Sequence, residues 1–279
     1  MNDSGISDSG TNASGKSTKP NATAEDAAPD RSSADIGIVC THKGEVKPFL
    51  RRLDRTRSYS DKKITVRGGF LGESTRIVVV EADEGFAAHR AATELLITEH
   101  RPTWILSVGF SSSLSAEVEP GDIIVANEIS DTHVNSMPIK CNIPARKRIH
   151  VGKLIVADDH PVTPAEKQAL RDRFPGLAAD TSSLAVAQVC QEHDIRCLAI
   201  RVAIDSIDEE IPEQAASMIF HPTSRALGSA IGTLFKGLRK IAVMNQWRER
   251  TNHAASHLDR FVTGIVEQIA ESIERQRLG

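Results

Sequence analysis

The stretch GFAAHRAATELLITEHRPTWILSVG, residues 85–109, places a helix directly before a buried strand. Apolar residues recur at helical spacing over residues 85–100, which predicts an amphipathic helix. The run TWILSVG at 103–109 is almost wholly apolar, which is typical of a strand buried on both faces of a sheet. A helix that leads into such a strand indicates the alternating organisation of an α/β protein.

The same alternation continues in both directions along the chain. The further predicted strands are 35–40, 62–72, 75–82, 121–129 and 196–204. The further predicted helices are 45–53, 164–174, 182–194, 225–244 and 253–274. Pro48 is expected in the first turn of its helix, where a missing N–H costs nothing. Short strands between helices predict an α/β fold around a mostly parallel, buried sheet.

The composition is that of a globular protein with an unstructured start. Of the 279 residues, 40% are hydrophobic and only 4% are aromatic, so the core is expected to be aliphatic. Residues 1–34 are rich in Ser, Asn, Asp and Gly and cannot bury enough surface to offset the entropy of ordering. We therefore predict a disordered N-terminal tail at 1–34 and a single α/β domain at 35–279.

Charge and cysteine usage exclude several functional classes. The formal net charge is −3, which gives no general attraction to nucleic acid. The four cysteines show no zinc-binding spacing, and the histidines show none either, so no metal site is expected. We find neither the ~18-residue apolar run of a membrane span nor a signal-peptide pattern. The sequence thus predicts a cytoplasmic protein without a membrane span or nucleic-acid partner.

Polar residues follow three of the predicted strands. Glu45 comes after strand 35–40, FSSSL (110–114) after strand 103–109, and Asp205 after strand 196–204. Ligands of open α/β sheets bind beyond the carboxyl ends of the strands. The pattern therefore predicts a pocket that holds a hydroxylated ligand and contains two acids.

Each of these features also has a purely structural explanation. Glu45 could be a first-turn acid that complements the helix dipole. Ser111 and its two neighbours could form an ordinary loop. Asp205 could cap a following helix, because DSIDE at 205–209 resembles a capping arrangement.

Four segments resemble one known superfamily, in the right order and over about residues 35–270. They are IGIVCTHKGEV (36–46), the stretch from Glu84 to Ile129, GKLIVADDHPVTPAEKQAL (152–170), and the stretch from Ala178 to Glu210. The family is that of the purine nucleoside phosphorylases and nucleosidases. The nearest branches are the methylthioadenosine/S-adenosylhomocysteine nucleosidases and the hopanoid-associated phosphorylases. The resemblance implies three α/β/α layers around a mixed, mostly parallel sheet.

The resemblance also implies roles for individual residues. Asp205 corresponds to the family's general acid, which protonates purine N7 while the N-glycosidic bond breaks. Burial at an apolar strand end can raise the pKa of such a carboxyl enough to keep its proton. Glu45 corresponds to the Glu that orients or deprotonates the attacking water. The residues implied in substrate binding are Ser111, Ser112, Val162 (through its backbone, at the base edge), Thr181 and Ser182.

The sequence departs from the family pattern at the sugar. A Met-Glu pair is usual, and that Glu binds the ribose hydroxyls, whereas this chain has Thr181 and Ser182. Losing two hydrogen bonds to a charged group implies a cost of ~3 kcal/mol or more. Asp180 is close by, but the helix pattern directs it elsewhere. The base-stacking aromatic of the nucleosidases falls near His160 and Pro161.

Two functions therefore remain open. One is an enzyme that cleaves an N-glycosidic bond on an unusual nucleoside. The other is a weak or inactive relative that binds a nucleoside-like ligand. Water is favoured over phosphate as the nucleophile, although His42 and Lys43 could attract phosphate, and no other cofactor is expected. The resemblance implies a homo-oligomer, a dimer or a higher assembly, for which the apolar stretch 225–238 could supply an interface or simply pack in the core.

Overall fold

The computed structural model describes residues 32–61, 64–133, 135–220 and 237–278. Residues 1–31 of the predicted tail (1–34) lie outside these ranges. Ala34 packs against the domain: it is 6% exposed, and its N–H donates to the carbonyl of His100 at 2.7 Å. The packed domain therefore reaches at least one residue beyond the predicted boundary.

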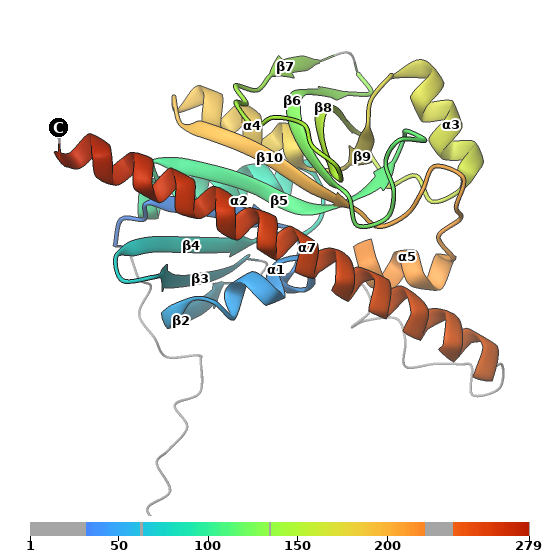
Figure 1. Ribbon diagram of the computed structural model, residues 1–279, viewed down its shortest axis with the longest axis horizontal. Helices are drawn as coiled ribbons and strands as arrows, with labels where there is room; N and C mark the ends of the chain where they lie inside the picture. Colours follow the sequence, from blue (N-terminus) through green and yellow to red (C-terminus); the bar gives the residue numbers. More distant parts are fainter. Residues whose placement is uncertain (1–31, 62–63, 134, 221–236, 279) are drawn as a thin grey trace, which may run out of the picture.

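The described strands form one mixed sheet (Figure 1). They are β1 (Ile36–Cys40), β2 (Asp54–Asp61), β3 (Ile64–Leu71), β4 (Thr75–Glu81), β5 (Trp104–Ser113), β6 (Ile123–Asp131), β7 (Ser136–Pro138), β8 (Ile149–Val156), β9 (Ala178–Asp180) and β10 (Arg196–Ala203). The order is β10-β6-β8-β9-β5-β1-β4-β3-β2, with β7 on β6. Because β5 also pairs with β10, strands β5, β10, β6, β8 and β9 form a closed circuit.

Strand direction varies along this sheet. The central strands β4, β1, β5 and β10 run parallel to one another, and β8 is parallel to both β6 and β9. The hairpins β2–β3 and β3–β4 and the pairs β6–β10 and β5–β9 are antiparallel. The predicted mixed, mostly parallel sheet is confirmed.

Helices cover both faces of the sheet. They are α1 (Lys43–Leu50), α2 (Phe86–His100), α3 (Pro164–Arg173), α4 (Ser183–Glu192), α5 (Glu213–Phe220) and α7 (Gly237–Leu278). One aliphatic cluster joins the sheet to α1, α5 and α7, and a second joins the opposite face to α2 and α4. Figure 1 shows α7 crossing the front of the sheet with α1 beside it. The predicted three-layer α/β/α architecture is confirmed.

The start of α1 corrects the expectation for Pro48. A capping box begins this helix at His42: the His42 ring accepts from the N–H of Gly44, and the Glu45 carboxylate accepts from the N–H of His42. The helix therefore starts two residues earlier than predicted. Pro48 becomes its sixth residue and lies inside the helix, not in the first turn.

The segment predicted as a loop after strand 103–109 is part of the strand. β5 continues through Ser113, and Ser112 and Ser113 pair with Ala179 and Ala178 of β9. Burial explains this extension, because Ser111, Ser112 and Ser113 are 0% exposed and their backbone groups need partners. Strands β2, β7, β8 and β9 were not predicted.

The C-terminal helices also differ from the prediction. Helices were expected at 225–244 and 253–274, but residues 237–278 form the single helix α7. Residues 225–236, including most of the expected dimer interface, lie outside the described ranges. Arg52 holds α7 to α1 through Asp259 at 2.6 and 2.8 Å, and Arg277 reaches Asp35 at 2.7 Å.

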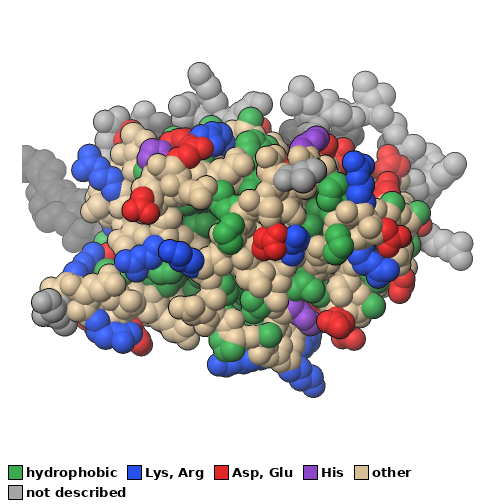
Figure 2. All heavy atoms as spheres, turned by 90° about the horizontal axis from the view of Figure 1, so that it is seen from above, with side chains coloured by type: hydrophobic (Ala, Val, Ile, Leu, Met, Phe, Trp, Pro, Cys, Tyr) green, Lys and Arg blue, Asp and Glu red, His purple; other side chains and the backbone are tan. Residues whose placement is uncertain are grey.

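The surface seen in Figure 2 carries charged side chains of both signs among scattered hydrophobic ones. In the part of the chain that the structure describes, no helix is long and apolar enough to cross a membrane.

Candidate active site

Glu45 lies just past the end of β1 and is 4% exposed. Its Oε2 accepts from the N–H of Thr41 at 2.8 Å and of His42 at 3.2 Å, and its Oε1 accepts from the N–H of Phe110 at 3.0 Å. No described Lys or Arg forms an ion pair with it. The carboxylate is thus held by backbone dipoles and keeps its negative charge available to a ligand.

The close approach of β5 to Glu45 depends on Gly109. A Cβ at this position would lie 2.8 Å from Glu45 Oε1, closer than real contacts allow. Glycine therefore lets the carboxylate settle against the strand and reach the N–H of Phe110.

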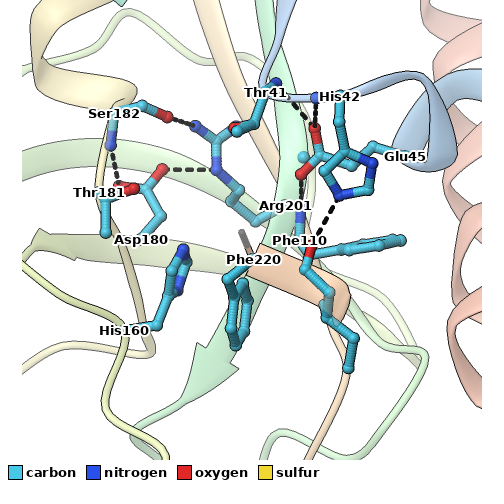
Figure 3. Close-up of a pocket in the computed structure, with 12 residues that line it drawn as sticks. Thr41, His42, Glu45, Phe110, His160, Asp180, Thr181, Ser182, Arg201 and Phe220 are labelled. Carbon is cyan, nitrogen blue, oxygen red and sulfur yellow. Dashed lines mark hydrogen bonds and ion pairs between the residues drawn. The ribbon is translucent and has the colours of Figure 1, made fainter. Parts of the chain in front are cut away.

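A buried ion pair lies beside Glu45 (Figure 3). Asp180 ends β9, and its Oδ2 accepts from Arg201 Nε at 2.5 Å. The other guanidinium N–H groups donate to Ser107, to the carbonyl of Ile200 and to Ser182 Oγ. All five donors of Arg201 are therefore used within the chain.

These groups line one pocket with little free space. Glu45, Asp180 and Arg201 form its wall, and His160 and Phe220 close it by stacking with ring centroids 3.7 Å apart (Figure 3). The free cavity is about 10 Å³, which is about what one water molecule requires. His42 Nε2 is 2.8 Å from the carbonyl of Ile219 and so ties α5 to the start of α1. In this arrangement the pocket has no room for a ligand larger than a water molecule.

Asp205 lies beyond the end of β10, as predicted, but does not line this pocket. It is 0% exposed; its Oδ1 accepts from the N–H of Ser113 at 2.8 Å, and its Oδ2 lies 2.5 Å from Lys167 Nζ. Burial raises the pKa of the Asp205 carboxyl to about 6, although the Lys167 ammonium opposes that shift. The group therefore exchanges its proton near neutral pH.

Strand β5 connects the two carboxylates. It extends beyond β1 on one side and β10 on the other, and it gives the N–H of Phe110 to Glu45 and that of Ser113 to Asp205. Three residues of strand separate these N–H groups by ~10 Å. The two acids are thus fixed by one element but kept apart, so each could serve a different end of a ligand.

Of the other five predicted site residues, two line this pocket and three do not. Thr181 and Ser182 line the pocket with Glu45. Ser111 and Ser112 are fully buried and do not line it, and neither hydroxyl has a partner in the described structure. Both backbone groups of Val162 are engaged, because its N–H donates to Glu166 Oε2 and its carbonyl accepts from the N–H of Ile211.

Three residues of this region were missed or misplaced by the sequence analysis. Asp180 was expected to point away, but it belongs to β9 rather than to a helix and faces Arg201. A signal for Arg201 existed, since a lone charge in the apolar run LAIRVAI needs a buried partner. Lys167 had no such signal, because it lies on a polar helix that reads as exposed.

In the described ranges, no three His, Cys, Asp or Glu side chains converge as metal ligands. The four cysteines are free thiols.

A mixed sheet with helices on both faces, and acids at the ends of neighbouring strands, defines a nucleoside phosphorylase-like α/β protein. The family model described as the phosphorylase superfamily matches residues 35–147 and 139–238. The chain belongs to the phosphorylase superfamily, as its sequence motifs predicted.

The relatives agree with this assignment. The chain is 25% identical over 246 residues to the 5′-methylthioadenosine/S-adenosylhomocysteine nucleosidase of Buchnera aphidicola subsp. Baizongia pistaciae (strain Bp), covering 76% of this chain and 96% of that protein. The predicted branch of nucleosidases is thereby confirmed as a close neighbour, and the expectation of an enzyme family holds.

Solved structures share the fold. The nucleosidase of the same name from Colwellia psychrerythraea 34H, in complex with adenine, superposes with a TM-score of 0.64 at 17% identity and covers 85% of this chain and 96% of that one. Futalosine hydrolase of Helicobacter pylori strain 26695 gives a TM-score of 0.59 at 16% identity, over 81% of this chain and 97% of its own.

Proposed function

We propose that this protein hydrolyses the N-glycosidic bond of a purine nucleoside or a 5′-modified adenosine. The observation that carries the proposal is the Glu45 carboxylate, which is buried in the pocket, held by three backbone N–H groups and not neutralised by any described cation. The nucleosidase names of the relatives give the bond and the substrate class.

Glu45 has the geometry of a base that activates water. Three N–H bonds fix both carboxylate oxygens and still leave lone pairs for a water proton. As the glycosidic bond stretches, the sugar becomes oxocarbenium-like, and a fixed negative charge beside it is stabilising. Glu45 would take the proton from the water that attacks the sugar carbon.

Asp205 would protonate the departing base. A purine leaves poorly as an anion and much better once it is protonated, and a carboxyl with a pKa of about 6 can supply that proton. Asp205 is fully buried and does not line the pocket, so this role requires that substrate binding bring the two together.

Water suits this pocket better than phosphate. Its wall carries the carboxylates of Glu45 and Asp180 against the single guanidinium of Arg201, whose donors are all used. Among the described lining residues, a phosphate dianion would meet a net negative wall with no free guanidinium or ammonium donor. Hydrolysis is therefore the favoured reaction.

The sugar side favours an altered ribose. Ser182 lines the pocket where the family carries its ribose-binding Glu, and its hydroxyl already contacts Arg201 Nη2 at 3.4 Å. A neutral hydroxyl holds a vicinal diol less strongly than a carboxylate does. We therefore expect the protein to select only weakly for an unmodified ribose. A nucleoside with a modified ribose or a bulky 5′ group should be a better substrate.

The test follows release of free base. Methylthioadenosine, S-adenosylhomocysteine, adenosine and inosine are incubated with the protein, with and without phosphate. We expect release that does not depend on phosphate and that falls ~10²–10⁴-fold in Glu45→Gln and Asp205→Asn. The exposed acid Asp208 provides the matched control, and Asp208→Asn should retain the wild-type rate.

Two results would contradict the proposal. Release that requires phosphate would make the protein a phosphorylase. Binding of nucleosides without any release would instead support the second predicted function, a binding protein in which Asp205 stays engaged with Lys167.

A further inference from the structure

Lys167 is a fully buried cation in a helix that otherwise faces solvent. It lies on α3, and its side chain is 0% exposed. Its Nζ donates to the carbonyl of Ser206 at 2.9 Å and of Glu209 at 2.5 Å and lies 2.5 Å from Asp205 Oδ2. The ammonium thus makes two hydrogen bonds and one ion pair, and all three partners belong to the turn that follows β10.

This turn, residues 205–211, is hereafter the acid turn. It is held from three other sides as well. Ser113 of β5 donates to Asp205 Oδ1, Val162 accepts from the N–H of Ile211, and Arg250 of α7 pairs with the Glu209 carboxylate at 2.5 Å. Lys167 is the only described contact that reaches both the backbone of the turn and its buried carboxyl.

We propose that Lys167 is the positioning residue for Asp205, fixing the orientation of its carboxyl and the oxygen that carries its proton. This inference rests on the proposed function, in which Asp205 serves the leaving base. The argument is geometric. Oδ2 lies 2.5 Å from the ammonium as an ion pair without hydrogen-bond geometry, so a proton on this oxygen would face the cation, whereas Oδ1 accepts one bond from the Ser113 N–H and keeps a lone pair. The proton of Asp205 is therefore directed to Oδ1.

Lys167 also opposes the effect of burial on this carboxyl. The charged groups that face Asp205 are Lys167 from α3 and Glu209 from the acid turn, and Arg250 of α7 neutralises Glu209. Burial and Glu209 raise the pKa of Asp205, and Lys167 lowers it. Removing the ammonium should therefore raise this pKa above its value of about 6.

The first test is the pH profile of base release in Lys167→Met and Lys167→Arg. In the Met variant we expect kcat to fall at least tenfold, and the pH above which activity declines to rise by about one unit or more. The Arg variant keeps the charge and should leave that pH within about half a unit. The control is Lys153→Met, which removes a surface lysine paired with Glu128 and should change neither kcat nor the profile. If kcat fell by the same factor at every pH, Lys167 would have only a structural role and the proposal would be overturned.

The second test needs no activity, so it separates failure of this inference from failure of the proposed function. The unfolding equilibrium is measured at pH 5 and pH 8 for Lys167→Met, Asp205→Asn and the double variant. A raised folded-state pKa means that stability is lost as pH rises through it. Lys167→Met should therefore increase the unfolding constant about tenfold more at pH 8 than at pH 5, and Asp205→Asn should abolish this difference.

The outcomes of this cycle are distinct. Should Lys167→Met alone fail to fold, recovery of folding in the double variant would support the pairing. A double variant that also fails to fold, or a Lys167→Met effect that is equal at both pH values, would overturn it. No base release in any protein, together with the expected cycle, would reject the proposed function and leave the Lys167–Asp205 coupling established.

Discussion

At the scale of single residues, the site depends on where buried charges find partners. Asp180 and Arg201 neutralise each other, Asp205 is held by Lys167, and Glu45 has only backbone donors. An uncompensated buried carboxylate is costly and persists only where the fold supplies several N–H groups. Its position beside a ligand pocket is the reason to assign Glu45 the reactive role.

Gly109→Ala tests this assignment without altering the acid itself. The new Cβ would lie 2.8 Å from Glu45 Oε1 and push the carboxylate away from the Phe110 N–H. A displacement of ~1 Å at a reacting group can cost ~10²-fold in rate, so kcat should fall by about that factor. The loss of stability should stay near ~1 kcal/mol, because the end of a side chain can move.

Gly264→Ala is the matched control for this substitution. Gly264 lies within α7 with nothing near its Cβ position, so alanine should leave kcat unchanged and raise helix stability by up to ~1 kcal/mol. Full activity in Gly109→Ala would exclude Glu45 as the base.

At the scale of elements, the apolar strands and the longer helices could be predicted from the sequence, and the short polar strands could not. β1, β4, β5 and β10 are runs of aliphatic residues, and that pattern is specific. β2, with the sequence DRTRSYSD, is an edge strand held by pairing with β3, which no local pattern reveals. Likewise, Ser111, Ser112 and Ser113 were expected to form a loop, but they are buried and belong to strand β5.

The same distinction applies to the site. The positions of Glu45 and Asp205 near strand ends were predictable, because each comes within a few residues of an apolar strand. Lys167 and Asp180 were not, since Lys167 of α3 meets Asp205 and Asp180 of β9 meets Arg201 only through contacts between distant segments. The sequence thus indicates where Glu45 and Asp205 lie and that Arg201 needs a partner, whereas the pairings Asp180–Arg201 and Lys167–Asp205 come from the tertiary structure.

The junction of α1 with α5 gives a prediction at this scale. The His42 ring caps α1 through Gly44 and also bonds the carbonyl of Ile219 in α5. His42→Ala removes both bonds and should cost ~1–2 kcal/mol, whereas His42→Asn can keep the cap and should recover about half of that loss. Urea unfolding of the two variants measures the difference. Equal stability of Ala and Asn would show that the helix cap contributes nothing.

At the scale of the whole molecule, α7 runs across the fold. It contacts the acid turn through Arg250 and the residue before β1, Asp35, through Arg277. Its 42 residues span ~63 Å, and it packs against α1, α5 and β10. The helix therefore supports both the sheet and the segment that carries Asp205, although it contributes no described side chain to the Glu45 pocket. We therefore expect the site to become less stable when the contacts that hold α7 against the domain are removed.

Arg52 is the residue that tests this docking. Its two bonds to Asp259 anchor α7 to the end of α1, and the Asp259 side chain is only 7% exposed. Arg52→Met should leave that carboxylate buried without its cation and destabilise the fold by ~1–3 kcal/mol. Arg90→Met breaks an exposed pair with Glu192 and should change stability much less than Arg52→Met does, because solvent screens that pair. Urea unfolding gives both values, and hydrogen exchange along α7 shows whether the loss is local. Equal effects of the two substitutions would mean that burial of Asp259 does not decide how α7 is held.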